Sequence, residues 1–184
     1  DSTNQLALQM GSAGLPGGTL ILAEQQNKGY GRFNREWVSP RGVNLYLSLL
    51  LRPHQHTYDF PLFSLATATG LAKAIRSATG LAAGVKWPND IMLEDKKVAG
   101  ILLEAGKKSG EVPYLVVGIG VNVNWDAADI PKELQATSLK AALGQPADRT
   151  GFINDILIAL AEQYQLLDMG KKDQLIHNLS ELCV

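Results

Sequence analysis

Two glycines, two arginines and a tryptophan stand close together in the segment Gly29-Tyr30-Gly31-Arg32-Phe33-Asn34-Arg35-Glu36-Trp37. Glycine allows backbone N–H groups to approach a ligand closely, and arginine grips a phosphate or carboxylate with two parallel hydrogen bonds. Trp37 adds a flat aromatic face. Together these residue types favour an anionic ligand with an aromatic ring, as a nucleotide has. The spacing is neither G-x-G-x-x-G nor a Walker loop, and a glycine-rich hairpin loop with solvated charges is the alternative.

A second candidate is the segment Lys86-Trp87-Pro88-Asn89-Asp90, in which a lysine ends a predicted strand and a rigid turn follows. The compact charge of Lys86 suits a phosphoryl or carboxylate oxygen. Asp90 could hold Mg²⁺ or fix the lysine. A plain Pro-Asn-Asp β-turn is the alternative, and taken alone the segment favours it.

The third candidate is Gly118–Asn124, which follows an apolar run. Glycines within a strand permit close backbone approach or a bulge. Asn122 and Asn124 would share a face if the strand continued, so one of them could bond a ligand; a twisted strand end leading into a turn is the alternative. His54 and His56 could form a metal pair, but no cysteine or third histidine stands near them, which favours a polar loop.

Hydrophobic patterning predicts the elements that must position these residues. Helices are expected from Ser2 or Thr3, as the first N-cap, through Leu6, Leu8 and Met10, and over residues 62–79, 150–169 and 171–182. Strands are expected over residues 19–25, 44–52, 84–87, 91–93, 97–105 and 114–124. This order predicts an α+β fold in which helices pack on a mixed, largely antiparallel sheet.

The composition excludes several classes of protein. Lys plus Arg number 17 and Asp plus Glu 18, a net charge of −1, which gives no electrostatic basis for a dedicated nucleic-acid or membrane-surface protein. The 184 residues, 46% of them hydrophobic, suit one globular domain. The single cysteine, Cys183, excludes an intrachain disulfide. It fits a reducing compartment, so we expect a cytoplasmic location.

The three segments, in this order, resemble the catalytic domain of biotin protein ligases (biotin–[acetyl-CoA-carboxylase] ligases). The resemblance begins at Asp1-Ser2-Thr3-Asn4 and continues through the loop, which is similar to G-R-G-R-x-x-R-x-W. It also includes KWPND at residues 86–90, KVAGILLE at residues 97–104 and GIGVN at residues 118–122. KWPND and KVAGILLE at this separation are highly specific, and the resemblance covers nearly the whole chain.

The resemblance implies a class II aminoacyl-tRNA synthetase-like fold and a reaction in two steps. Biotin and Mg-ATP give biotinyl-5′-AMP and pyrophosphate, and the ε-amine of one lysine on a biotin carboxyl carrier domain of acetyl-CoA carboxylase then displaces AMP. Two anions must meet, so cations must neutralise them. The intermediate hydrolyses in water, so a loop should close over it. No membrane or nucleic-acid partner is implied for this chain.

The resemblance also implies roles for single residues. Lys86 resembles the lysine that bridges the biotin carboxylate and the α-phosphate, and we expect it to be catalytic together with Arg32. Asp90 is the expected Mg²⁺ ligand or lysine-orienting group, and Ala99 is expected beside Gly100 in the strand along the biotin pocket. The implied biotin contacts are Ser2, Thr3, Asn4, Gln26, Gly29, Tyr30, Lys86 and Gly100. The implied ATP contacts are Arg32, Arg35, Trp37, Asn89 and Asn122.

Three loop residues depart from the family pattern, which usually has Arg at position 30, Gly at 34 and often a small or polar residue at 33. Tyr30 removes one cation, and a lost charged hydrogen bond costs about 1.5–3 kcal/mol of binding. We therefore expect weaker retention of biotinyl-AMP than in relatives with the full motif.

The resemblance further predicts that residues 1–184 are the catalytic domain alone. It predicts this domain without the SH3-like domain that commonly follows it and without the helix-turn-helix domain that precedes it in repressor relatives. Some relatives pair their sheets edge to edge, and residues 114–124 are the candidate strand for such a homodimer.

Two other functions stay open. One is a lipoate–protein ligase of the same fold, although its triple-glycine motif is absent from this sequence. The other is a biotin sensor that transfers nothing.

Overall fold

A computed structural model describes residues 1–53, 60–106 and 113–184. His54 and His56 lie outside these ranges. The described chain forms one six-stranded sheet in the order β1-β2-β6-β5-β4-β3, and neighbouring strands are antiparallel. The strands are β1 (Leu20–Ala23), β2 (Leu45–Leu51), β3 (Gly84–Lys86), β4 (Asp90–Leu93), β5 (Lys96–Gly106) and β6 (Tyr114–Val121). The predicted α+β class and largely antiparallel sheet are confirmed.

The helices are α1 (Thr3–Ser12), α2 (Phe60–Thr79), α3 (Leu139–Leu143), α4 (Arg149–Asp168) and α5 (Lys172–Ser180), with 3₁₀ turns at Arg32–Asn34 and Lys132–Leu134. Ser2 is the N-cap of α1, because its side chain accepts a hydrogen bond from the Asn4 N–H. The sequence did not predict α3 or the 3₁₀ turns, which are too short to show a helical period. Within the described ranges, none of the helices has the length and apolar character needed to cross a bilayer.

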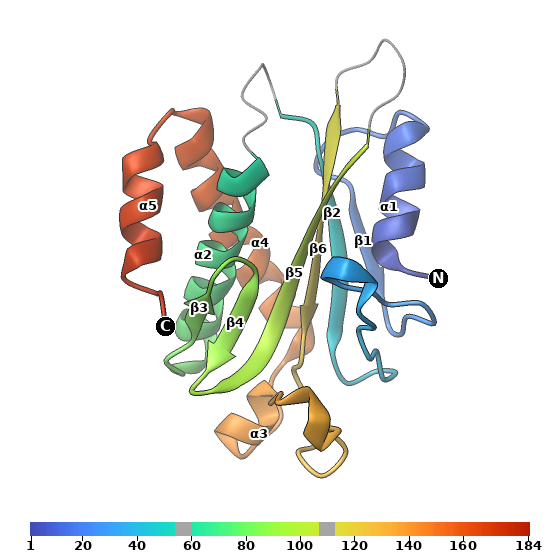
Figure 1. Cartoon of the computed structure of the whole chain (residues 1–184), viewed down its shortest axis with the longest axis vertical. Coiled ribbons are helices and arrows are strands. Elements are labelled where there is room, and N and C mark those ends of the chain that lie inside the picture. The colour runs from blue at the N-terminus through green and yellow to red at the C-terminus, as the bar shows by residue number, and fades with distance from the viewer. Residues whose placement is uncertain (54–59, 107–112) are drawn as a thin grey trace.

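The two faces of the sheet differ in what covers them (Figure 1). Because strand side chains alternate, Leu47, Ile101 and Ile119 point to one face. They are buried there in the main core with α2 and α4. The opposite face carries α1 at one end, where Ala7 packs with Leu50, Tyr114 and Val116. The rest of that face is left for the site.

One feature of α1 was not anticipated from the sequence, and the expectation about residues 114–124 is corrected. In α1, Leu6 is 40% exposed, whereas Thr3, Asn4, Ala7 and Gly11 are buried, because the helix lays its polar first turn on the sheet. The strand over 114–124 is not an edge available for pairing, because β6 lies between β2 and β5. The edges of the described sheet are β1 and β3, and the end of the chain covers β3. There the Val85 N–H donates to Leu182 O at 2.7 Å, and the Val184 N–H donates to Val85 O at 3.2 Å.

Candidate active site

A cavity of about 630 Å³ lies on the open face of the sheet, between the first turn of α1, the loop at residues 29–37, and β4 to β6. It brings together the three sequence segments, which come from distant parts of the chain. The predicted site residues that line it are Ser2, Thr3, Asn4, Gln26, Tyr30, Arg32, Arg35, Trp37, Lys86, Asn89, Asp90, Gly100 and Asn122. Gly29 instead lines a second cavity beside the loop. Ala99 faces the helix-covered core and is fully buried there.

Bare backbone at three glycines forms the floor of the cavity. Gly100 of β5 pairs with Gly120 of β6, and Gly118 of β6 pairs with Ser48 of β2. The Trp37 ring lies so close that a Cβ would come within 2.9 Å of it at position 100 and 2.5 Å at position 120. At position 118 a Cβ would collide with the Asn4 carboxamide. The predicted close approach to the backbone is confirmed, because a side chain at any of these positions has no space.

Polar side chains close the cavity at the α1 end, and we call Ser2, Thr3, Asn4, Gln26 and Ser48 the polar end. The N–H and Oγ1 of Thr3 donate to Gln26 Oε1 at 2.9 and 3.1 Å. Ser48 Oγ lies 2.8 Å from Thr3 Oγ1 and 2.5 Å from Asn4 Oδ1, and its single proton serves one of them at a time. All but Gln26 are buried. Internal hydrogen bonds therefore hold these groups in place.

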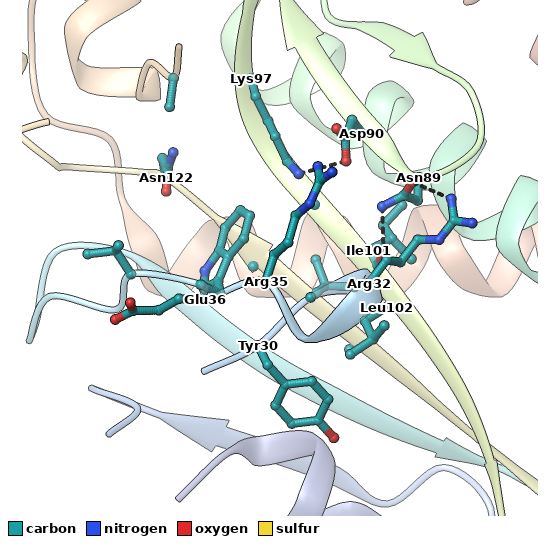
Figure 2. A pocket seen from close by; sticks show the side chains of 18 of the residues that line it. Tyr30, Arg32, Arg35, Glu36, Asn89, Asp90, Lys97, Ile101, Leu102 and Asn122 are labelled. Atoms are coloured by element: carbon teal, nitrogen blue, oxygen red, sulfur yellow. Dashed lines mark hydrogen bonds and ion pairs between the residues drawn. The ribbon is translucent and has the colours of Figure 1, made fainter. Parts of the chain in front are cut away.

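Glu104 of β5 joins the polar end to the loop. Its Oε2 accepts hydrogen bonds from Asn4 Nδ2 and from Tyr30 Oη, both at 2.8 Å. Burial, followed by the hydrogen bond and charge of Glu104, raises the pKa of Tyr30 well above its usual range, so the phenol remains a donor. Figure 2 shows that Tyr30 points to one side of the loop, whereas Arg32 and Arg35 rise on the other. Sequence reasoning did not single out Glu104 as a site residue.

Exposed cations line the opposite side, and we call Arg32, Arg35 and Lys86 the cationic rim. Arg32 Nη1 donates to Asn89 Oδ1 at 3.2 Å, and this bond ties the loop to the turn before β4. Asn89 Nδ2 in turn donates to Ile101 O at 3.2 Å. The two arginines lie in and beside a 3₁₀ turn in which Phe33 and Asn34 have φ values of 58° and 55°. Asparagine tolerates this left-handed conformation better than most residues, which explains how Asn34 stands where the family pattern has glycine.

Lys97 is a cavity residue whose role the motifs did not reveal. Its Nζ lies 2.7 Å from Asp90 Oδ1 and 5.2 Å from the centre of the Trp37 ring. Strict alternation along β5 would place Lys97 on the same face as Ala99. However, Ile91 pairs with Ala99 while Met92 pairs with Lys97, so Val98 is an extra residue in a β-bulge. The bulge turns Lys97 onto the cavity face, beside Gly100.

The predicted metal role of Asp90 finds no support in its surroundings. Among residues 1–53, 60–106 and 113–184, no three His, Cys, Asp or Glu side chains come together in a way that could hold an ion. The Asp90 carboxylate is already neutralised by Lys97 rather than by Lys86. These residues do not form a magnesium site by themselves, since Mg²⁺ prefers several oxygen ligands in octahedral geometry. The other expected role of Asp90, to orient a lysine, fits its ion pair with Lys97, and its metal role stays a prediction.

The two asparagines after β6 take different places. The Asn122 side chain is buried at the cavity wall, where its Nδ2 donates to Thr137 O at 3.0 Å. Asn124 exchanges two hydrogen bonds with the backbone of Ala147, each at 2.9 Å, and does not line the cavity. The expectation of a shared face depended on a continuing strand, but β6 ends at Val121.

The arrangement suits a long ligand with three chemically different parts. The polar end offers neutral donors and acceptors, the floor accepts a flat ring, and Lys97 with the cationic rim stabilises negative charge. Two ligands whose anionic groups meet near Lys97 would both be neutralised there. The cavity therefore has cations placed to neutralise two anionic groups that meet in it.

Comparisons with known proteins agree with this chemistry. The model of the biotin/lipoate A/B protein ligase family matches residues 1–122. A biotin–[acetyl-CoA-carboxylase] ligase from Paracoccus denitrificans is 38% identical over 173 residues, which cover 91% of this chain and 71% of the relative. The bifunctional ligase/repressor BirA of Bacillus spizizenii is 38% identical over 166 residues, 89% of this chain and 51% of BirA. The chain thus spans about half the length of that relative.

A solved structure supports the same assignment. The biotin protein ligase from Aquifex aeolicus in complex with biotin and ATP superposes with a TM-score of 0.89 at 29% identity, covering 100% of this chain and 75% of that one. The chain therefore belongs to the biotin/lipoate A/B protein ligase family. Within that family, the relatives named here are biotin ligases, and they confirm the resemblance found in the sequence motifs.

Proposed function

We propose that this chain is the catalytic part of a biotin–[acetyl-CoA-carboxylase] ligase. It activates biotin with ATP and transfers it to a lysine of a biotin carboxyl carrier domain, in the cytoplasm. The observation that carries the proposal is the cavity itself, in which a buried polar end and a cationic rim lie on either side of a glycine floor. The ureido ring of biotin has two N–H donors and one carbonyl acceptor, which the polar end complements. A dithiolane, as in lipoate, has no group for such an end to bond, so this end favours biotin.

In the first step, a biotin carboxylate oxygen attacks the α-phosphorus of ATP, the bond to the β-phosphate breaks and pyrophosphate leaves. The residues of this chain neutralise the two anions and hold them in contact. Lys97 is better placed for this than Lys86, because its amine lies against the floor at Gly100 and is held by Asp90. Lys86 is exposed at the rim, where it suits the β- and γ-phosphates. Mg²⁺ would arrive with the triphosphate.

In the second step, the amine of the carrier lysine attacks the carbonyl carbon of biotinyl-5′-AMP. The bond from that carbon to the phosphate oxygen breaks, AMP leaves with the electron pair, and the attacking nitrogen loses a proton. The Trp37 ring lies against the floor at Gly100 and Gly120, beside Lys97, and supplies an aromatic face for the adenine. The loop that carries Trp37 also covers the cavity, which limits hydrolysis of the anhydride.

The test is mass spectrometry of a biotin carboxyl carrier domain incubated with the chain, biotin and Mg-ATP. We expect the carrier to gain one biotin. Lys97→Ala is expected to lower the rate by a factor of about 100 or more, in the range of a lost transition-state donor, and Lys86→Ala by less. Arg41→Ala is the matched control, because Arg41 is exposed and does not line the cavity. Binding of biotin without adenylate or transfer would support the sensor function and overturn the proposal. A larger loss for Lys86→Ala would return the central role to that residue.

A further inference from the structure

A hydrogen bond between the side chains of Tyr30 and Glu104 joins the glycine-rich loop to β5, beside the polar end. Tyr30 Oη donates to Glu104 Oε2 at 2.8 Å. The same oxygen accepts from Asn4 Nδ2 at 2.8 Å, and Asn4 Oδ1 lies against Ser48 Oγ. One carboxylate oxygen thus connects the loop, β5, α1 and β2.

The rest of the loop shows why this contact matters. Its turn is held by backbone hydrogen bonds from the Gly31 N–H to Arg35 O at 2.8 Å, from the Arg35 N–H to Arg32 O at 3.3 Å and from the Trp37 N–H to Gly29 O at 2.9 Å. These bonds fix the shape of the loop. Its Trp37 end is also tied to Gln26 through Ser39, whose Oγ accepts from Gln26 Nε2 at 3.2 Å and donates to Trp37 O at 2.9 Å. On the rim side, the Arg32–Asn89 bond is longer, at 3.2 Å, and exposed. On the other side, the Tyr30–Glu104 bond is short and half-buried, with a charged acceptor.

We propose that Tyr30 and Glu104 form a latch that holds the loop at residues 29–37 over the glycine floor, and that both are positioning residues for the adenylate site. This inference rests on the proposed function, because the latch sets how long biotinyl-5′-AMP is retained. Tyr30 acts through the loop and not on the reacting atoms, since its hydroxyl points away from Arg32 and Arg35 (Figure 2). Glu104 also accepts a hydrogen bond from Asn4 of the polar end. The same hydrogen-bond network therefore connects the place where biotin would bind with the loop that closes over it.

The chemistry of the pair suits a latch. A phenol that donates to a carboxylate makes a charge-assisted bond, about twice as strong as a neutral one. Loss of such a bond corresponds to a roughly 10- to 100-fold shift in the opening equilibrium. The bond also restrains Trp37, seven residues further on, because the loop between them is closed by the backbone bonds named above.

The first experiment uses the chain without any ligand. Hydrogen exchange followed by mass spectrometry would compare the wild type with Tyr30→Phe, which keeps the ring and removes only the donor. We expect amides of residues 29–37 to exchange roughly 10- to 100-fold faster in Tyr30→Phe, with an unchanged unfolding midpoint. Tyr164→Phe is the matched control, because Tyr164 Oη makes a 2.7 Å bond to Thr67 Oγ1 between α4 and α2, remote from the loop. Equal loop exchange in the wild type and Tyr30→Phe would overturn the latch.

A second variant tests whether the two residues act as a pair. Glu104→Gln keeps the shape of the side chain but removes its charge, so we expect a smaller acceleration of loop exchange than in Tyr30→Phe. The double variant is expected to exchange no faster than Tyr30→Phe alone, because one bond is lost in either case. Additive effects of the two substitutions would contradict a shared bond and overturn the proposal.

The functional readout is the rate at which preformed biotinyl-5′-AMP leaves the protein. Tyr30→Phe is expected to release it roughly 10- to 100-fold faster, whereas Tyr164→Phe is expected to release it at the wild-type rate. Failure of the wild type to form any adenylate would overturn the proposed function and not the latch, which the ligand-free exchange decides separately. Adenylate that forms and then leaves Tyr30→Phe at the wild-type rate would overturn the latch as a positioning device.

Discussion

The polar end and the cationic rim of the cavity both bind through polar groups, yet they differ in burial and in their existing bonds. Thr3, Asn4 and Ser48 are less than 9% exposed and bonded to one another. Arg32, Arg35 and Lys86 are exposed, and the hydrogen bond from the Arg32 guanidinium to Asn89 is 3.2 Å long. The polar end is therefore part of the fold, and its geometry exists before any ligand arrives. The exposed side chains of the rim stay hydrated in the folded protein, and they lose water only when a ligand covers them.

This difference separates the expected effects of mutation. A change at the polar end leaves buried groups without partners, so it lowers the free energy of unfolding as well as the affinity. A change at the rim removes an exposed charge. Such a charge contributes little to folding, but it strengthens anion binding once the ligand excludes water. Substitutions that affect one quantity and not the other therefore test the comparison directly.

The largest effect is expected for Gly118→Ala, at the floor beside the polar end. The new Cβ would collide with the Asn4 carboxamide, which must then leave its bonds to Ser48 and Glu104. Overpacking of this kind costs about 1–3 kcal/mol in the free energy of unfolding, and biotin binding should be lost with it. Urea denaturation and calorimetric titration with biotin measure the two effects.

Gly31→Ala is the control for this stability measurement, because the nearest atom to a Cβ at position 31, Arg35 O, is 3.9 Å away. Equal stability of Gly118→Ala and the wild type would show that the polar end can rearrange freely, contrary to the comparison.

A smaller and more selective effect is expected at the rim. Arg32→Ala and Arg35→Ala should leave the free energy of unfolding within about 0.5 kcal/mol of the wild type. The affinity for ATP should fall by about 1.5–3 kcal/mol for each lost charged hydrogen bond. Because the charges are exposed, added salt should also weaken ATP binding in the wild type more than in either variant. Titrations at two ionic strengths, with Arg41→Ala as the control, measure both. A rim variant that unfolds as easily as Gly118→Ala would remove the distinction between the two ends.

The smallest change is expected for Tyr30→Arg, which restores the residue usual in relatives. We expect biotinyl-5′-AMP to leave up to about tenfold more slowly, because a guanidinium makes stronger charge-assisted bonds than a phenol. The structure offers two acceptors for it, the ligand phosphate and Glu104. The same substitution in a Glu104→Ala background separates them, since slower release would persist there only if the arginine reaches the phosphate. Release from Tyr30→Arg at the wild-type rate would contradict the sequence-based expectation.

Much of the fold could be predicted from local patterns in the sequence. The strand runs and the long helix at Arg149–Asp168 were found within a few residues, since apolar period and turn residues determine them. The burial of the polar first turn of α1 was not predicted, because a helix that buries Thr3 and Asn4 on a glycine-bearing sheet does not follow an apolar stripe. Only the tertiary contact with Gly118 explains why these polar side chains are buried.

Fewer of the site residues could be predicted from the sequence, because the position of some of them depends on tertiary contacts. Motifs identified Arg32 and Trp37 because their residue types are unusual together, and the cavity contains both. Lys97 was overlooked as a site residue, since its orientation depends on the bulge at Val98, which only strand pairing reveals. Glu104 was overlooked because it follows an apolar run in β5 and its partners, Tyr30 and Asn4, are 74 and 100 residues away in the chain.

The glycine floor has a further consequence for what the cavity can accept. A wall made of peptide groups has no rotamers to change, so its shape follows the hydrogen-bond ladder between β5 and β6. Making room there would mean sliding one strand past another, whereas room at the mouth needs only the movement of arginine side chains. The cavity therefore selects ligands by thickness at its centre and tolerates variation in length at its mouth.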